Sequence, residues 1–306
     1  MRRDALYFPG LVPTKFSTIE TFLRTDDHAR RRLAEADEFL GYSLMDAYAE
    51  ADVYDWEVYE SGFMVVTLAL ADWALENVEL NPVLCGGQSF GAIIAAVFSG
   101  ALSYQDGLAL VRNSVLVEVD YFDHQPEPLG CLFFYRMTSQ QVDDLVAEFR
   151  AAGRDVEVSI YLDDSVHAVS GTLADLELLE ARVREAGGFP FYTMNRSEHC
   201  PSVRPLRDRL ETEVYDRVSW HRPKWPMLSD VSGKLLTDPE EIEQDLLDGW
   251  VTPVHWSTVV GGMRDAGTEQ VHIIGPRNMF SRITNNALPT EVITPKKVVD
   301  RATSPA

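Results

Sequence analysis

The chain has 306 residues, of which 45% are hydrophobic and 25% charged, the proportions of an ordinary soluble globular protein with one large or two modest domains. Its 48 acidic and 27 basic residues give a formal net charge of −21. This balance argues against nucleic acid as a partner, because such binding depends on cations that neutralise phosphates. A membrane span is also not expected, since no stretch reaches the roughly 20 uninterrupted apolar residues that one needs.

The three cysteines, Cys85, Cys131 and Cys200, form no C-x-x-C pair. Neither a disulfide framework nor a structural zinc site is therefore expected, and Cys85 and Cys131 are predicted to be buried free thiols. The N-terminal stretch MRRDALYFPG has too short an apolar part for a secretory signal, which predicts a cytoplasmic protein.

The first part of the chain alternates strand and helix patterns. Residues 3–9 predict a strand that ends in FPG. A charged helical pattern follows over 25–41, with Thr25 as its expected N-cap, and residues 60–78 are apolar on nearly all sides, which predicts a buried helix. The elements expected next are a strand over 82–87, a helix over 92–98, and a helix over 103–122 with Ser103 as its N-cap.

A turn-rich stretch near residue 125, HQPEPLG, precedes a compact strand-helix-strand-strand-helix-strand series, the order of a ferredoxin-like unit. A further strand, QVHIIGP, follows later. We therefore predict an α/β fold in which a large α/β-hydrolase-like domain with a parallel sheet, residues 1–124 and 195–306, carries an inserted ferredoxin-like subdomain, residues 125–194. The last segment, 295–306, is expected to be a loose tail.

The stretch Gly87-Gln88-Ser89-Phe90-Gly91 matches G-x-S-x-G between a predicted strand and helix, the setting of a nucleophile elbow. Its glycines are needed because side chains at so tight a bend would clash with the strand or the helix. Ser89 would lie at a helix N-terminus, where free N–H groups favour a developing negative charge, and the N–H of Phe90 is the natural first oxyanion donor. The simpler alternative is a strand-to-helix turn with serine as N-cap, but three glycines and a small-residue helix favour the nucleophile.

A serine hydroxyl needs a base, usually a histidine, and the chain offers seven. His199, in NRSEHCPSVRP, lies where the chain re-enters the large domain after the inserted subdomain, which favours it as the base. The other histidines lie in a charged helix, in a polar loop, inside predicted strands or beside tryptophans: His28, His124, His167, His221, His255 and His272.

These stretches resemble the malonyl-CoA:acyl-carrier-protein transacylase family and the acyltransferase domains of polyketide synthases, over nearly the whole chain. YFPG stands where that family has FPGQG, and GGQSFGAIIAAVFSGALSYQDGLALV follows GHSxGExxAxxxAGxLxxxDAxxLV. The later stretches SVHAVSGT, SEHCPSVRPLRD, TPVHW and IIGPRNMF are similar to further family motifs, in the same order and spacing.

The resemblance implies a ping-pong acyltransferase in which Ser89 carries the acyl group and His199 is its general base and later its general acid. It also implies that the main-chain carbonyl of Gly249 orients His199. The second oxyanion N–H would come from Leu11, where the family has glutamine, and only the backbone is needed for that role. No metal or bound cofactor is expected, because the phosphopantetheine arm of a carrier protein, or CoA, arrives with the substrate.

One departure from the family pattern concerns the acyl group directly. Ser114 stands where malonyl-specific members have an arginine that binds the free malonyl carboxylate as a bidentate pair. Serine cannot replace that guanidinium, and an unpaired buried carboxylate is costly, so a malonyl substrate is disfavoured. Arg112 lies two residues away on the same helix and therefore points about 200° away.

A second departure lies directly before the base. The sequence RSEH places Glu198 where the family has a phenylalanine or serine that shapes the acyl pocket, and Gln88 replaces the usual histidine before the nucleophile. A cation lost at Ser114 and an anion gained at Glu198 suit an acyl group that carries an amine. The alternative is that Glu198 turns outward or pairs with Arg196.

The resemblance also implies acyl-carrier proteins as partners. These are acidic, so this acidic chain needs a positive local face. The candidate docking residues are Arg204, Arg207 and Arg209, which follow His199, and Arg277 and Arg282, which follow IIGP.

Together these features predict a discrete acyltransferase of polyketide-type biosynthesis. It would move a non-carboxylated acyl group, such as an aminoacyl or peptidyl-type starter, from an acyl thioester to the phosphopantetheine thiol of an acyl-carrier protein. Four alternatives stay open: an editing hydrolase of the same fold, a malonyl transacylase with another carboxylate anchor, an inactive carrier-docking module, and an unrelated α/β-hydrolase with a late histidine such as His272 as base.

Overall fold

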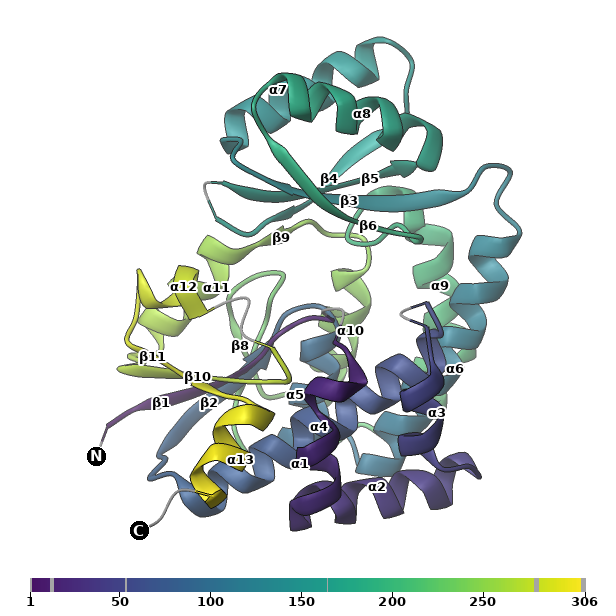
Figure 1. Cartoon of the computed structure of the whole chain (residues 1–306). Helices are drawn as coiled ribbons and strands as arrows, with labels where there is room; N and C mark the ends of the chain where they lie inside the picture. Colours follow the sequence, from purple (N-terminus) through teal and green to yellow (C-terminus); the bar gives the residue numbers. More distant parts are fainter. Residues whose placement is uncertain (1, 12–13, 53, 164, 278–280, 304–306) are drawn as a thin grey trace.

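The computed structural model describes residues 2–11, 14–52, 54–163, 165–277 and 281–303. Two β-sheets and the helices around them form a large lower part and a smaller upper part (Figure 1). The helices are α1 (Glu20–Thr25), α2 (Asp27–Leu40), α3 (Leu44–Glu50), α4 (Trp56–Asn77), α5 (Phe90–Ser99), α6 (Tyr104–Asp123), α7 (Ser139–Ala151), α8 (Leu173–Glu185), α9 (Arg204–Glu213), α10 (Pro239–Gly249), α11 (Trp256–Asp265), α12 (Ser281–Asn285) and α13 (Pro295–Thr303).

The sheet of the large part is parallel except at one edge. Its strands, in spatial order, are β11 (Thr290–Ile293), β10 (Gln270–Ile274), β1 (Asp4–Phe8), β2 (Pro82–Gly87), β7 (Met227–Leu228) and β8 (Leu235–Leu236). Only the pair β7–β8 is antiparallel among these described strands. Every residue of β1 is buried, as expected for a central parallel strand covered by helices on both faces.

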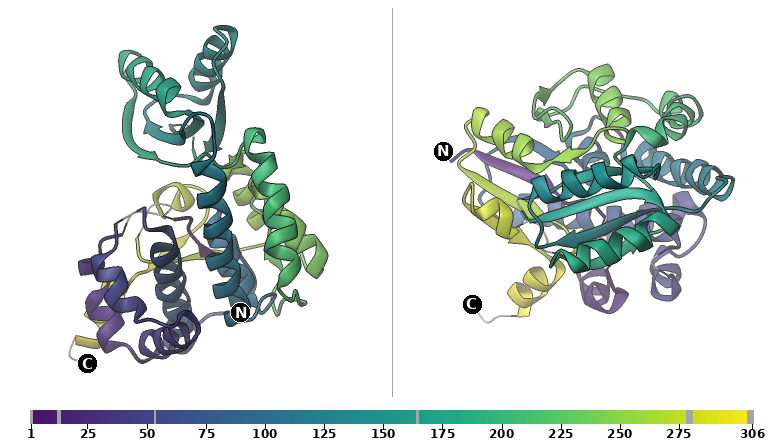
Figure 2. Two further views of the ribbon diagram at one scale, coloured as in Figure 1. Left: turned by 90° about the vertical axis from the view of Figure 1, so that its right-hand side faces the viewer. Right: turned by 90° about the horizontal axis from the view of Figure 1, so that it is seen from above.

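The small part contains the second sheet, in the order β6 (Phe189–Met194), β3 (Leu129–Tyr135), β5 (Val166–Thr172), β4 (Val156–Tyr161) and β9 (Val254–His255). Strands β3 to β6 pair antiparallel in the order expected for a ferredoxin-like unit. Helices α7 and α8 cover the face that is turned away from the large part (Figures 1 and 2).

Successive side chains of the small sheet point to opposite faces. Leu132 and Phe134 belong to a separate hydrophobic core beneath α7 and α8, whereas Cys131 belongs to the core of the large part. The predicted fold class, a large α/β domain with a small subdomain, is confirmed. The limits 125–194 stay a prediction, and β9, from a later stretch of the chain, pairs with β4 of the small sheet.

Helix α4 is the buried helix that its nearly uniform apolarity predicts. It is the one helix among the described residues that is long and apolar enough to cross a membrane, yet 83% of its most apolar window is buried inside the protein. It packs against α2, α3, α5 and α6, so its apolar surface belongs to the core.

Ser103 caps α6 as predicted, by accepting from the N–H of Asp106. The expected cap of the earlier charged helix is wrong. Asp26 caps α2 because its carboxylate accepts from the N–H groups of the next turn, whereas the Thr25 hydroxyl donates to the carbonyl of Thr21 in α1.

The expectation of a loose tail is also wrong for the described residues after Thr294. They form α13, which packs against α1 and α4 and buries Val298. The guanidinium carbon of Arg301 lies 5.4 Å from the ring centre of Trp73, which fixes the far end of the helix.

Candidate active site

The bend after β2 has the geometry of a nucleophile elbow. Ser89 has φ 55° and ψ −124°, a conformation that a residue with a side chain rarely adopts, and its hydroxyl makes no capping bond to α5. A Cβ on Gly87 would lie 2.0 Å from the carbonyl of Gly91, and one on Gly91 would lie 2.1 Å from the carbonyl oxygen of Phe8. Both positions therefore exclude any side chain, which explains the two glycines of the motif.

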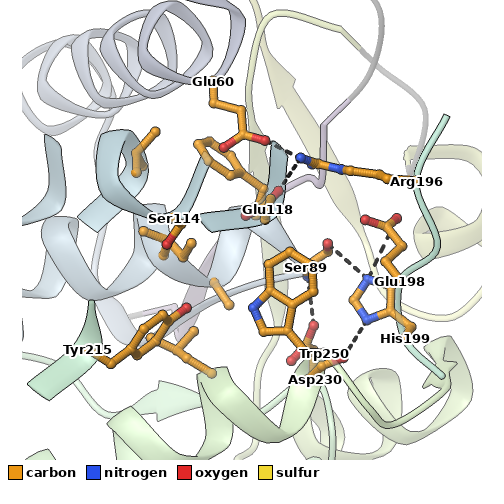
Figure 3. Close-up of a pocket in the computed structure, with 16 residues that line it drawn as sticks. Glu60, Ser89, Ser114, Glu118, Arg196, Glu198, His199, Tyr215, Asp230 and Trp250 are labelled. Atoms are coloured by element: carbon orange, nitrogen blue, oxygen red, sulfur yellow. Dashed lines mark hydrogen bonds and ion pairs between the residues drawn. The ribbon is translucent and has the colours of Figure 1, made fainter. Parts of the chain in front are cut away.

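His199 lies against the hydroxyl of Ser89. The distance from Nε2 of His199 to Oγ of Ser89 is 2.9 Å, and the distance from Nδ1 to the carbonyl oxygen of Gly249 is 2.6 Å (Figure 3). Because a carbonyl only accepts, Nδ1 carries the hydrogen and Nε2 is left to accept from the serine hydroxyl. The structure thus brings together the three groups that the sequence selected as nucleophile, base and orienting carbonyl.

The site lies where parallel strands of the large sheet end. Ser89 follows β2, Leu11 follows β1, Asp230 follows β7 and Arg277 follows β10. The carboxyl ends of neighbouring parallel strands meet at one edge, which is the usual ligand-binding edge of such sheets. Leu11 and Ser89 consequently line the same cavity, as the predicted oxyanion hole requires.

Two cavities meet at Ser89. The larger has a volume of about 360 Å³ and lies between the two parts of the molecule, with walls that include Trp56, Tyr59, Phe133, Ile160 and Tyr192. The smaller has a volume of about 50 Å³ and extends towards α6. Ser89, Arg196 and Glu198 line both cavities.

A buried ionic cluster lies beside the smaller cavity, and the sequence analysis missed two of its members. Nη1 of Arg196 lies 2.5 Å from a carboxylate oxygen of Glu118, and Nη2 lies 2.8 Å from one of Glu60. The guanidinium also stacks 4.0 Å from the ring centre of Trp56. Burial raises the pKa of Glu118 to about 8 and also raises that of Glu60. The signal that could have revealed Glu60 was its position directly before the uncharged run 61–71 of α4.

Ser114 and Glu198 both face the site. Ser114 is buried on α6 and lines the smaller cavity together with Ser89. Glu198 is buried as well, and its Oε1 lies 3.8 Å from Nε2 of His199. The alternative that Glu198 turns outward is therefore wrong. The hydrogen-bonded ion pairs of Arg196 are those with Glu60 and Glu118.

Asp230 is a further site residue that the sequence analysis missed. Its Oδ2 accepts from the backbone N–H of Ser89 at 2.7 Å, and it is only 4% exposed. Gln88, beside the nucleophile, is buried and lines the larger cavity.

The predicted docking arginines differ in exposure. Arg204, Arg277 and Arg282 are exposed. Arg209 pairs with Asp120 and Glu213. The docking prediction for Arg207 is wrong, because its side chain is buried and held by Glu211, Asp208 and Gln244.

Two other residues lie away from the site. Nε of Arg112 lies 3.4 Å from Glu57, as expected from its direction on α6. His272 is fully buried within β10 and its Nε2 lies 3.3 Å from Asp4, the first residue of β1. The alternative with His272 as base of Ser89 is therefore wrong.

The chain is similar to known acyl-transferring enzymes. Residues 133–194 match the family model of the VinK acyltransferase small domain. The malonyl CoA-acyl carrier protein transacylase of Bacillus subtilis (strain 168) is 24% identical over 317 residues, which cover 99% of this chain and 96% of that protein.

Solved structures show the same fold. The acyl-carrier-protein S-malonyltransferase of Burkholderia pseudomallei 1710b is 21% identical, with a TM-score of 0.86 over 99% of each chain. A malonyl-transacylase in complex with its type II PKS acyl-carrier protein is 20% identical, with a TM-score of 0.85 over 95% of this chain and 96% of the other. The chain thus has the fold of the malonyl-CoA:acyl-carrier-protein transacylases, and it is an enzyme of the acyltransferase class.

Proposed function

We propose that this chain is a cytoplasmic acyltransferase of polyketide-type biosynthesis that moves a non-carboxylated acyl group to the phosphopantetheine thiol of an acyl-carrier protein. The observation that carries the proposal is the contact of 2.9 Å between Oγ of Ser89 and Nε2 of His199, with Nδ1 held by Gly249. The carrier protein as partner is supported by relatives named as carrier-protein transacylases, one of them solved in complex with its carrier.

The mechanism follows from these positions. Oγ of Ser89 attacks the thioester carbon while His199 takes its proton on Nε2, and the N–H groups of Phe90 and Leu11 hold the oxyanion. The C–S bond then breaks, and the leaving thiol takes the proton back from His199. In the second half of the cycle the carrier thiol attacks the acyl-serine, His199 takes the thiol proton, and Ser89 regains its hydrogen as the acyl group leaves.

The charges of the smaller cavity support a non-carboxylated acyl group, whereas Arg277 contributes a further guanidinium to the larger cavity. Four carboxylic residues line the smaller cavity, Glu60, Glu118, Glu198 and Asp230, against the single guanidinium of Arg196. The two terminal nitrogens of that guanidinium already bind Glu60 and Glu118, so they do not replace the arginine missing at Ser114. An acyl group that carries an ammonium would lie among carboxyl groups that can pair with it, whereas a malonyl carboxylate would lie among them without a cation of its own.

Intact-mass detection of acylated Ser89 tests this function. The enzyme is mixed with N-acetylcysteamine thioesters of an aminoacyl group, of its neutral isostere and of malonate, with and without holo-carrier protein. We expect acyl-Ser89 from the aminoacyl thioester and transfer when carrier is added. Release of free acid in the presence of carrier would instead support an editing hydrolase, labelling by malonate alone a malonyl transacylase, and no labelling a docking module.

Glu198→Gln is expected to lower the preference for the aminoacyl thioester over its neutral isostere by roughly tenfold, because a hydrogen bond to a charged group contributes about 1.5–3 kcal/mol. The rate of acyl-Ser89 formation with each thioester measures the preference. Glu57→Gln is the matched control, since Glu57 pairs with Arg112 outside both cavities. An unchanged preference in Glu198→Gln would rule out recognition of the amine by this carboxylate.

Arg282→Glu is expected to slow transfer to the acidic carrier roughly three- to tenfold more than it slows reaction with a small thioester, because rim charges mainly change association rates. Quenched assays with the carrier and with the small thioester measure the two rates. Arg24→Glu, an exposed charge reversal on α1, is the control. Equal slowing of both reactions would argue against docking at Arg282.

A further inference from the structure

Asp230 holds the backbone of the serine at its most strained point. Its Oδ2 accepts from the N–H of Ser89 at 2.7 Å, directly beside the positive φ of that residue. The Asp230 side chain is buried and lines the smaller cavity together with His199 (Figure 3). A buried carboxylate at this place therefore affects both the shape of the elbow and the charge beside the imidazole.

The loop after β7 is built to present this carboxylate. The hydroxyl of Ser229 accepts from the N–H groups of Val231 and Ser232, which closes a tight turn around Asp230. The same hydroxyl donates to Oδ1 of Asp245 at 2.5 Å, which anchors the turn to α10. Asp245 thus supports the loop without contacting Ser89. A substitution at Asp245 therefore disturbs the loop but leaves the hydrogen bond from Asp230 to Ser89 in place.

The partner of His199 on its Nδ1 side is neutral, so it does not balance the charge of a protonated ring. Nδ1 donates to the carbonyl of Gly249, so no net charge faces the ring there. When Nε2 takes the proton of Ser89, the ring becomes a buried cation, and a buried cation is costly unless a negative group lies near.

We propose that Asp230 is a positioning residue for acyl transfer, in which Oδ2 fixes the N–H of Ser89 in the strained turn and the negative charge stabilises the protonated His199. The proposal rests on the proposed Ser89–His199 mechanism. Asp230 thus has two functions. A neutral acceptor at this position would still hold the Ser89 N–H, but it would not stabilise the protonated ring.

Other titratable groups face the same space. Tyr7 on β1 and Asp245 on α10 interact with Asp230, and Glu198 lies 3.8 Å from Nε2 of His199. Burial raises the pKa of Asp230, while the Ser89 N–H and His199 favour its ionised form. Charge loss at Asp230 must therefore be tested with Glu198 and Asp245 unchanged.

The test measures how fast phenylmethanesulfonyl fluoride sulfonylates Ser89, by intact mass, between about pH 5 and 9. This reagent has no acyl group, so the result does not depend on which acyl group the enzyme prefers. Asp230→Asn keeps an acceptor for the Ser89 N–H and removes the charge. We expect its maximal rate to fall about tenfold and the acid limb of the profile to move about one pH unit lower, since one unit corresponds to a tenfold change in equilibrium. Asp230→Ala also leaves the Ser89 N–H without its acceptor, so its maximal rate should fall further.

Asp245→Asn is the matched control, because it removes a neighbouring half-buried carboxylate and weakens the same turn. The proposal is overturned if Asp230→Asn follows the wild-type profile, or if Asp245→Asn moves the acid limb equally far. Ser89→Ala distinguishes failure of the mechanism itself: sulfonylation of that variant at the wild-type rate would contradict Ser89 as nucleophile, whatever Asp230 does. Asp230→Asn is nearly isosteric and carries the test even where Asp230→Ala does not fold.

Discussion

Ser89→Ala is expected to abolish acyl-enzyme formation and to lower acyl transfer by about 10⁴-fold or more, because loss of a serine nucleophile removes the covalent route entirely. Alanine keeps the Cβ that the elbow already accommodates, so the fold should be retained. The measurement is the acylated fraction by intact mass, together with the rate of acyl transfer to holo-carrier.

His199→Ala should approach the same loss, since the two residues act as one unit and their effects are not additive. Ser99→Ala is the matched control: Ser99 is a buried serine on the helix that follows Ser89, and its hydroxyl donates to the carbonyl of Ala96. The assignment of the nucleophile fails if Ser89→Ala is still acylated, or if Ser99→Ala is as inactive.

Arg196→Met is expected to lower the free energy of unfolding by roughly 3–5 kcal/mol at neutral pH, because it leaves buried carboxylates without their cation. Glu60 and Glu118 are each about 4% exposed at their side chains, so water does not replace the guanidinium. Urea unfolding measures the change. The triple variant with Glu60→Gln and Glu118→Gln should recover much of the loss, since it removes the charges that Arg196 balances.

The decrease in the free energy of unfolding caused by Arg196→Met should depend on pH. The folded-state pKa of Glu118 is raised by burial to about 8, above its ordinary value of 4.5. A raised pKa means that the contribution of this group to stability is fully present below about pH 4.5 and is lost as the pH rises through about 8. In Arg196→Met the guanidinium no longer lowers the pKa of Glu118, so that pKa rises further. The free energy of unfolding should therefore keep falling above about pH 8, where the contribution of Glu118 levels off in the wild type. A pH-independent difference between the two proteins would contradict the assignment.

The elbow could be predicted because its causes are local. Glycine at 87 and 91 is dictated by carbonyl groups within a few ångströms, and such steric demands leave a short pattern in the sequence. The strand over 82–87 is also present at its predicted bounds. His199 was found through its position after the inserted subdomain and through the family resemblance.

Features that depend on distant partners could not be predicted in this way. Arg196 meets Glu60 and Glu118 across separations of 136 and 78 residues, and nothing local in the sequence couples them. Arg207 is as basic as Arg204 in sequence. Its pair with Glu211, four residues further along α9, is local, but only the fold brings it to Asp248 of α10. Strands of two residues, such as β7 and β9, are too short to leave a periodic pattern.

Strand β9 connects one wall of the larger cavity to the large part. It continues into α11 of the large part and pairs with β4, where Val254 lies opposite Ile160. Main-chain bonds therefore tie Ile160, which lines the larger cavity, to a strand that leads directly into α11 of the large part. The position of this wall relative to the large part thus does not depend on side-chain packing alone.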